Sequence, residues 1–260
     1  MADCSQLFFW NGLALFIGSL RDNRTHRHHA IQLCIALNEP FRLVRETGSG
    51  HYRAAIIASD VAHRFQGDGG RHILLLVEPE STAGRHLTHG LLETTAIVDL
   101  ESLFDARQLE RMVPPADSGP SLCRLASHLR DYILDTLGFE QRAPVAMDPR
   151  IQKAVMRMRA METKKMPARE LAAELAISES RLIHLFTEQI GIPIRPYLRW
   201  LRLIEAVKTI LTGRSLTEAA HAAGFADSAH LSRTFRLMFG FSPSDILKND
   251  RFVQAVSCAC

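Results

Sequence analysis

Two stretches in the last third of the chain carry polar and basic side chains that can recognise the edges of DNA bases. The guanidinium of Arg233, for example, can donate two hydrogen bonds to O6 and N7 of one guanine. Side chains on the first two turns of a helix that enters the major groove face these base edges. With the expected buried positions removed, the candidates are Ser180, Arg181, Ile183, His184 and Thr187 in the first stretch, and Ser228, Ala229, His230, Ser232, Arg233 and Arg236 in the second.

A repeated pattern predicts the elements that position these side chains. In each copy a short helix carries a small inner residue, Ala172 or Ala220, and ends four residues later at Ala176 or Gly224. Corresponding residues lie 48 positions apart before the turn and 49 after it, so the second turn has one extra residue. Small inner residues let two helices cross closely, which leaves the second helix free to enter a groove. The pattern also contains apolar turn residues (Ile177, Phe225), polar caps (Ser178; Asp227 or Ser228), buried residues of the second helix (Leu182, Phe186; Leu231, Phe235) and closing glycines (Gly191, Gly240).

This double pattern resembles the DNA-binding domain of AraC/XylS-type bacterial transcription regulators. The run GFxDxxHLSRTFRxxFGxSP from Gly224 to Pro243 carries the strongest part of the resemblance. The resemblance implies double-stranded promoter DNA and RNA polymerase as partners. The first reading helix departs from its relatives, because Ile183 and His184 stand where longer polar or basic side chains are common, although Ile183 can touch a thymine methyl. By resemblance, the base-facing residues are Ser180, Ile183 and His184 in the first helix, and Ser228, Ala229, Ser232 and Arg233 in the second.

Positive charge is concentrated in the same part of the chain. Residues 1–146 contain 14 arginines and no lysine against 17 acidic residues, whereas residues 147–260 contain 17 basic and 11 acidic residues. The resulting net charges, −3 and +6, place the excess where phosphate binding requires it. A helix predicted over residues 194–211 joins the two copies. Its apolar face includes Leu198, Leu201, Ile204 and Ile210, and on another face we expect Arg195, Arg199 and Arg202 to contact phosphates rather than only water.

Residues 1–100 predict short β-strands instead. Apolar or alternating runs over residues 8–20, 28–39, 40–46, 52–59 and 72–80 are separated by turn-forming residues. Many short strands of this kind are typical of a small barrel. By resemblance to the N-terminal domains of the same family, the barrel is expected to be cupin-like. The segments THRHHAIQLCIAL and SDVAHRF are similar to the two landmarks of that fold.

Histidines in these landmarks suggest what the barrel binds. Nine of the twelve histidines precede residue 147. By the cupin resemblance, His26, His28 and Gln32 have the spacing at which two histidines and a glutamate bind metal, and His63 falls at the later histidine. Three imidazoles suit Zn²⁺, Ni²⁺ or Fe²⁺, but Gln32 replaces the carboxylate, and most family members hold an organic effector without metal. We assign these four residues to binding a small-molecule effector, and keep a divalent transition metal as the alternative. His51, His72, His86 and His89 are expected at the surface.

From residue 100 onward the pattern becomes helical. Residues 100–113 predict one helix and residues 121–138 another, which has an apolar stripe along one face. The stripe packs either on the barrel or on a second subunit; we favour a homodimer, because related regulators commonly dimerise through this region. Residues 140–149 lack periodicity and are interpreted as a linker, after which Asp148 caps a helix that starts at Pro149. The stripe consists of Leu122, Leu125, Leu129, Tyr132 or Ile133, and Leu137, and the helix after Asp148 is expected to bury Ile151, Val155 and Met158.

The predicted architecture is α+β. A cupin-like effector barrel (1–100) is followed by a helical dimerisation region (101–139), a linker (140–149), an all-α domain of two helix-turn-helix units joined by a long helix (150–250), and a tail (251–260). Cys258 and Cys260 in the tail have a spacing that allows both sulfurs to reach one ion, but an exposed, frayed tail is favoured. Five scattered cysteines argue against a disulfide framework. The chain shows neither a membrane span nor a signal peptide, which predicts a cytoplasmic protein.

These observations predict a sequence-specific DNA-binding transcription regulator, an activator whose behaviour changes when a small molecule binds the barrel. Two other classes stay open. The first is a cupin metalloenzyme fused to a DNA-binding domain; the sequence argues against it, because it offers no carboxylate ligand and no obvious acid–base pair. The second is a DNA-binding protein whose barrel dimerises and senses nothing.

Overall fold

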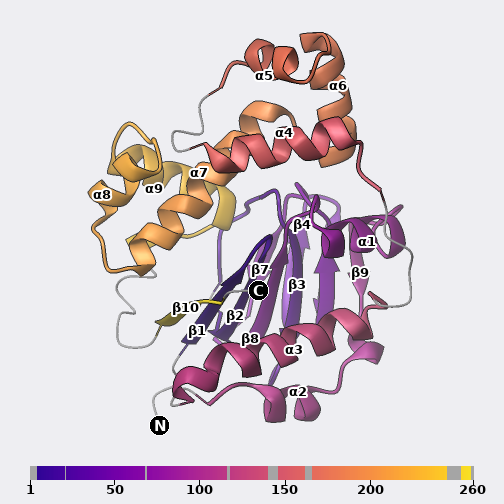
Figure 1. Cartoon of the computed structure of the whole chain (residues 1–260). Coiled ribbons are helices and arrows are strands. Elements are labelled where there is room, and N and C mark those ends of the chain that lie inside the picture. Colours follow the sequence, from indigo (N-terminus) through magenta and orange to yellow (C-terminus); the bar gives the residue numbers. More distant parts are fainter. Residues whose placement is uncertain are drawn as a thin grey trace. The chain divides into compact units, whose positions relative to one another are not determined.

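The computed structural model describes residues 5–20, 22–67, 69–115, 118–139, 146–161, 166–244 and 253–258. The chain divides into two compact units, one formed by Met1–Val145 with Phe239–Cys260 and the other by Ala146–Met238. Strands dominate the first unit and helices make up the second (Figure 1), which confirms the predicted fold class. The boundary between the units falls inside the predicted linker, most of which (residues 140–145) lies outside the described residues.

Two sheets build the N-terminal unit. The larger has the strand order β10-β1-β2-β8-β3-β6-β9 and the smaller the order β5-β4-β7. Neighbouring strands are antiparallel, except that β1 and β10 run parallel. The larger sheet consists of β1 (Ser5–Trp10), β2 (Leu13–Ser19), β3 (Ile31–Ala36), β6 (Ala54–Ile57), β8 (Arg71–Val77), β9 (Ile97–Asp99) and β10 (Val253–Ser257), and the smaller of β4 (Phe41–Arg45), β5 (Gly48–Tyr52) and β7 (Arg64–Gln66).

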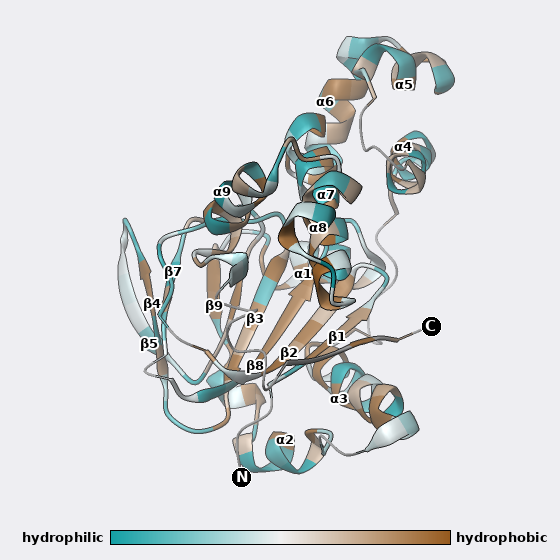
Figure 2. Ribbon diagram, turned by 90° about the vertical axis from the view of Figure 1, so that its left-hand side faces the viewer, coloured by the Kyte–Doolittle hydropathy of each residue, from teal (hydrophilic) through white to brown (hydrophobic). Residues whose placement is uncertain are grey.

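The centre of the larger sheet is buried on both faces. Along β3, Leu33 and Ile35 belong to the main core cluster. The alternate residues Cys34 and Ala36 belong to a second cluster, together with Phe41 from the smaller sheet. Successive side chains of a strand point to opposite faces, so the second cluster lies between the two sheets. Figure 2 shows the result, with hydrophobic residues along β1, β2 and β8 and more polar ones in β4 and β5.

The helices after residue 80 differ in part from the prediction. A helix over Thr82–Gly90 (α1) was not predicted. Residues 100–113 do not form one helix, because the Asp105 carboxylate accepts the N–H of Arg107 and starts a new helix; η1 (Glu101–Leu103) precedes this cap and α2 (Ala106–Met112) follows it.

The apolar stripe of α3 (Leu122–Thr136) packs on its own sheet. Leu122, Leu129 and Ile133 are buried in the main core cluster of the same unit. The expectation that this stripe contacts a second subunit is therefore wrong, since the stripe is already covered within the chain. The homodimer itself stays a prediction.

The C-terminal tail also differs from the prediction. Residues 253–257 form β10 alongside β1, and the N–H of Cys258 donates to the carbonyl of Phe9 at 2.9 Å. Cys258 is buried and forms a disulfide with Cys123, at a Cα–Cα distance of 5.5 Å. An exposed, frayed tail and unpaired cysteines are therefore wrong for this segment. Cys260 lies outside the described residues.

The described residues of the C-terminal unit form the helices α4 (Pro149–Ala160), α5 (Ala168–Glu174), α6 (Glu179–Ile190), α7 (Ile194–Leu211), α8 (Leu216–Ala222) and α9 (Ser228–Phe239), the last of which ends at a residue of the N-terminal unit. Asp148 caps α4, and Ile151, Val155 and Met158 are buried, as predicted. The long helix α7 buries Leu198, Leu201 and Ile210, while Ile204 is half-buried. No helix in the described part of the chain is long and apolar enough to cross a membrane.

The two turns of the repeat share one backbone geometry. Ala176 and Gly224 both have positive φ, 53° and 76°. After each of them the chain folds back, because the N–H of Ile177 donates to the carbonyl of Ala172 (3.1 Å) and that of Phe225 to the carbonyl of Ala220 (2.8 Å). The repeat read from the sequence is therefore a repeat of hydrogen bonds as well.

This geometry makes opposite predictions for the two turns. Ala176→Gly should stabilise the C-terminal unit by about 1 kcal/mol, because the left-handed conformation costs alanine about 1–2 kcal/mol and glycine almost nothing. Gly224→Ala should destabilise it by a similar amount. The measurement is urea unfolding followed by the fluorescence of the buried Trp200 in a Trp10→Phe background. Ala173→Gly, which is exposed on α5, is the matched control and should destabilise. If Ala176→Gly and Ala173→Gly changed the free energy of unfolding by the same amount, the left-handed conformation of Ala176 would be contradicted.

Candidate nucleic-acid interface and histidine cluster

The caps of α6 and α9 fix where each reading helix begins. The hydroxyl of Ser178 accepts the N–H of Arg181 (3.2 Å), and the carboxylate of Asp227 accepts the N–H of His230 (2.6 Å). The sequence left Asp227 and Ser228 open as the cap of the second helix, and the structure shows that the cap is Asp227. Ala226 is therefore the extra residue of the second turn. The hydrogen bond from His230 lowers the pKa of Asp227. This keeps an anion at the positive end of the helix dipole.

The outer face of α6 carries the predicted residues. Ser180, Arg181, Ile183 and His184 are exposed, while Leu182 and Phe186 are fully buried. Ile183 is 43 % exposed, which is unusual for a large apolar side chain on a helix that has a well-packed inner face. Thr187 is half-buried and its hydroxyl donates back to the carbonyl of Ile183 at 2.8 Å. Thr187 therefore contributes less to this face than the other candidates.

The outer face of α9 corresponds to that of α6, although exposure differs at two of the paired positions. Ala229, Arg233 and Arg236 are exposed and Ser228 and Ser232 are half-buried. The ring of His230 packs edge-on against Phe225, with centroids 5.3 Å apart, so this candidate supports the turn. An offset of 49 residues pairs Ser180 with Ala229, Ile183 with Ser232, His184 with Arg233 and Thr187 with Arg236.

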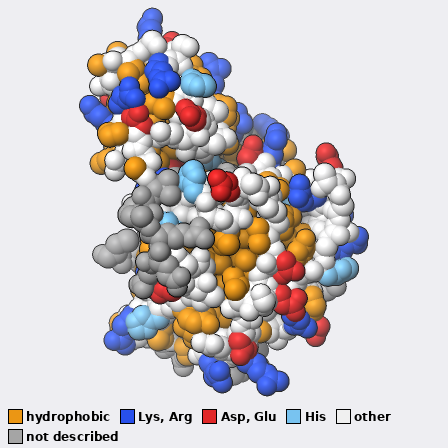
Figure 3. All heavy atoms as spheres, turned by 90° about the vertical axis from the view of Figure 1, so that its right-hand side faces the viewer, with side chains coloured by type: hydrophobic (Ala, Val, Ile, Leu, Met, Phe, Trp, Pro, Cys, Tyr) orange, Lys and Arg blue, Asp and Glu red, His pale blue; other side chains and the backbone are white. Residues whose placement is uncertain are grey.

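Several arginines of this unit have no carboxylate partner. Arg195 and Arg199 on α7 and Arg233 on α9 are exposed, and none forms an ion pair with a described residue. By contrast, Arg157 pairs with Glu174 at 3.1 Å and Arg150 pairs with Asp148. Unpaired guanidinium groups are available to phosphates. Figure 3 shows Lys and Arg side chains spread over the helical lobe at the top of that view.

Arg202 does not belong to this group. It is half-buried, donates to the carbonyls of Leu198 (3.4 Å) and Gly224 (3.5 Å), and lies 5.9 Å from the ring centroid of Phe225. Burial lowers the pKa of its guanidinium. This side chain braces the second turn, and its expected contact with phosphate stays a prediction.

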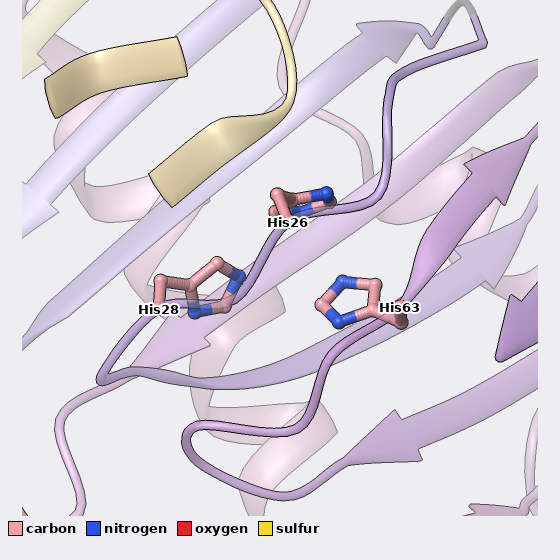
Figure 4. Close-up of side chains that lie close together, drawn as sticks. All are labelled: His26, His28 and His63. Atoms are coloured by element: carbon pink, nitrogen blue, oxygen red, sulfur yellow. The ribbon is translucent and has the colours of Figure 1, made fainter. Parts of the chain in front are cut away.

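Three histidines of the N-terminal unit converge, as Figure 4 shows. His26 and His28 precede β3 and His63 precedes β7, and the backbones of His26 and His63 exchange two hydrogen bonds of 2.9 and 3.0 Å. The ring centroids of His26 and His63 are 4.3 Å apart, and each lies 5.6 Å from that of His28. All three side chains are buried. The structure thus brings together the three histidines that the sequence singled out.

In each of the three rings Nδ1 lies 2.9 Å from a backbone carbonyl two residues away, that of Arg24, Ala30 or Val61. This contact favours a proton on Nδ1 in His26 and His63, whereas His28 also faces the Gln32 oxygen at Nε2. Burial, reinforced by repulsion between neighbouring rings, lowers the pKa of His26 to about 4 and that of His63 to about 3. The pKa of His28 is lowered by burial too. At neutral pH the rings therefore offer lone pairs on Nε2 rather than charge.

Gln32, which the sequence already placed with the cluster, is joined there by groups that the sequence did not link to it. Gln32 places its side-chain oxygen 2.9 Å from Nε2 of His28 and donates through its amide nitrogen to the sulfur of Cys34 (3.2 Å). Within the same unit, the ring of Phe239 lies 5.9 Å from that of His28, and the carbonyl of Gly240 accepts the N–H of Arg24 (3.0 Å). No local pattern marks Cys34 or Gly240, because they reach the cluster through pairing distant in sequence.

Two of the histidines expected at the surface are buried. His72 packs edge-on against Phe41 and Phe65, at 5.7 and 5.2 Å, and His86 packs in the same way against Phe139 at 5.1 Å. These two expectations are therefore wrong. His51 and His89 are exposed as predicted.

Comparisons with known proteins agree with this arrangement. A family described as a helix-turn-helix domain matches residues 171–249. The HTH-type transcriptional regulator YidL of Escherichia coli is 32 % identical over 100 residues, which cover 38 % of this chain and 34 % of that protein. The HTH-type transcriptional regulator GbdR of Pseudomonas aeruginosa is 34 % identical over 99 residues, covering 37 % of this chain and 27 % of that protein. The chain thus spans about a third of the length of the curated relatives it matches.

One solved structure resembles nearly the whole chain. It is an apo variant of ToxT from Vibrio cholerae, with a TM-score of 0.64 over 91 % of this chain and 97 % of ToxT. At 12 % sequence identity this likeness concerns the fold.

An arginine that contacts a base and an arginine that contacts a phosphate should differ in the effect of their replacement by alanine. Arg233→Ala should remove about 1–3 kcal/mol of discrimination at one base pair, because a two-pronged contact to guanine is lost. Arg199→Ala should weaken all duplexes alike and reduce the slope of log K against log salt by about 0.9, because one phosphate contact is lost. Fluorescence anisotropy with a set of single-base variants at several salt concentrations measures both. Arg157→Ala, whose charge is already compensated by Glu174, is the control; unchanged base preference in Arg233→Ala would refute the groove assignment.

Proposed function

Since the C-terminal part of this chain, residues 171–249, is a helix-turn-helix domain of the AraC type, we propose that the protein regulates transcription by binding double-stranded promoter DNA. One observation carries the proposal: α6 and α9 follow turns of the same backbone geometry and both expose polar side chains on their outer faces, and α7, which joins the two units, carries exposed arginines. Two reading helices joined by one long helix suit successive turns of a major groove.

The N-terminal unit is the proposed sensor. Its interior holds a buried cluster of three neutral imidazoles beside Gln32, and such a constellation of polar groups inside an apolar core favours ligand binding. ToxT, which shares the fold, has also been crystallised with an unsaturated fatty acid bound. We propose that ligand binding here changes promoter binding or contact with RNA polymerase, that the protein acts as an activator in the cytoplasm, and that it works as a homodimer.

An enzymatic role is the less favoured alternative. A metalloenzyme needs an acid–base pair beside its metal, and among the described residues the histidine cluster is accompanied by Gln32 and Cys34 rather than by a carboxylate. Burial raises the pKa of the Cys34 thiol to about 12, so this sulfur does not supply a nucleophile at neutral pH.

Selection from a pool of random duplexes tests the proposal without knowledge of the target. The selected sites should contain two blocks of conserved bases about 10 base pairs apart, one for each reading helix. If Arg181, Arg195, Arg199 and Arg236 each neutralise one phosphate, the slope of log K against log salt should be about −3.6. Selection that enriches no sequence, or binding that does not depend on salt, would exclude DNA reading as the function.

A further inference from the structure

We propose that His26, His28 and His63 bind one divalent transition metal ion of the zinc class, with the side-chain oxygen of Gln32 as a neighbouring fourth ligand. One ligand atom from each histidine lies within 4.8 Å of the others. Two nitrogens bound to the same Zn²⁺ at about 2.0–2.1 Å lie about 3.3 Å apart in a tetrahedral site, so modest shifts of buried side chains complete the site. The ion would be the ligand that the N-terminal unit senses, and in this respect the metal site rests on the proposed function.

The hydrogen bonds of the three rings orient them as metal ligands. The Nδ1–H of His26 and of His63 donates outward to a backbone carbonyl, so the Nε2 of each presents a lone pair. Metal-binding histidines are held in this way by a carbonyl or carboxylate on the second nitrogen. Nε2 of His63 is buried and accepts no hydrogen bond within the described structure. A bound cation would satisfy this atom.

The contact between Gln32 and His28 points to the same ligand. A neutral imidazole has one N–H, but His28 faces an oxygen at each ring nitrogen, the carbonyl of Ala30 at Nδ1 and the Gln32 oxygen at Nε2, both at 2.9 Å. Whichever nitrogen holds the proton, the other nitrogen and its oxygen are two acceptors that face each other. Two acceptors this close need a hydrogen or a cation near both. A cation bound beside His28 and Gln32 would therefore stabilise an arrangement of acceptors that is unfavourable without one.

The chemistry of the cluster also selects among ligands. Nδ1 of His26 and of His63 already faces a backbone carbonyl, so an anionic molecule in the cluster would meet lone pairs on Nε2 instead of N–H donors. Mg²⁺ and Ca²⁺ prefer oxygen ligands. Three imidazoles and one amide oxygen favour Zn²⁺, Ni²⁺ or Cu²⁺.

A short chain of contacts leads from the site to the end of α9. Nδ1 of His26 donates to the carbonyl of Arg24, and the N–H of Arg24 donates to the carbonyl of Gly240. Gly240 has φ of 77°, and a Cβ there would lie 2.9 Å from Nδ1 of His26. The backbone at Gly240 is therefore too close to the imidazole for any side chain. Gly240 directly follows Phe239, the last residue of α9. An ion that shifts His26 would therefore act on the residue that closes this helix.

Binding to the full-length protein tests the site first. After the chain is stripped with a chelator, competition with a chromophoric zinc indicator should show one Zn²⁺ per chain. His26→Ala and His63→Ala should each weaken binding at least about tenfold, since the loss of an outer-shell partner alone costs about 10- to 100-fold. His51→Ala, on the exposed edge of β5, is the matched control and should leave binding unchanged. Gln32→Glu should bind more tightly than the natural chain, because a carboxylate replaces a neutral amide.

The outcomes separate the metal site from the proposed function. Absence of a stoichiometric ion, or equal weakening by His63→Ala and His51→Ala, would overturn the metal site. Far-UV circular dichroism shows whether the histidine variants fold. If they do not, X-ray absorption of the metal-loaded natural chain and of Gln32→Glu still tests the metal site, because the spectrum must show histidine nitrogens as ligands. An ion that binds without changing the affinity for selected duplexes would overturn its role as the sensed ligand. Loss of all salt-dependent DNA binding would instead refute the proposed function and leave the metal measurement valid.

Discussion

Both reading helices depend on one backbone constraint, a residue in the left-handed conformation between the two helices of each unit. Gly224 meets this constraint without strain, whereas Ala176 meets it at φ 53° and loses about 1–2 kcal/mol. The loss is tolerated because the turn lets Leu182 and Phe186 become fully buried, and each such side chain contributes about 1.5–3 kcal/mol. Packing therefore decides the conformation of the first turn, and the sequence of the turn itself decides that of the second.

The buried histidines of the N-terminal unit show how differently one residue type can be used. His72 packs its ring edge-on against Phe41 and Phe65, and no other imidazole lies against it among the described aromatic contacts. Such a ring serves as an aromatic filler of the core. His26 and His63 instead bring their rings within 4.3 Å although neighbouring imidazoles lower each other's pKa. An arrangement that is unfavourable for charged rings and leaves lone pairs facing inward favours a cation as its occupant.

The C-terminal unit was predictable because its signals are local. The cap at Asp148, the glycine after α6 and the spacing of Leu231 and Phe235 each act within one or two helical turns. In the N-terminal unit the pairing partners are distant in sequence. The strand β10 and the disulfide between Cys123 and Cys258, 135 residues apart, leave no mark in a local pattern, and β7 is too short to show alternation. His26, His28 and His63 were nevertheless singled out, because the two segments that hold them resemble the landmarks of the cupin fold.

The two reading helices are copies in geometry but not in chemistry. At the positions where α6 carries His184 and Thr187, α9 carries Arg233 and Arg236. An imidazole and a hydroxyl that bonds its own helix offer fewer donors to phosphate or guanine than two guanidinium groups do. We therefore expect the second helix to supply more of the electrostatic affinity, and exposed Ile183 of the first helix to offer an apolar contact to a thymine methyl. Because α7 joins the two helices in one unit, we expect the second helix to position the first on DNA, so that a weak base preference of the first helix adds to the total affinity.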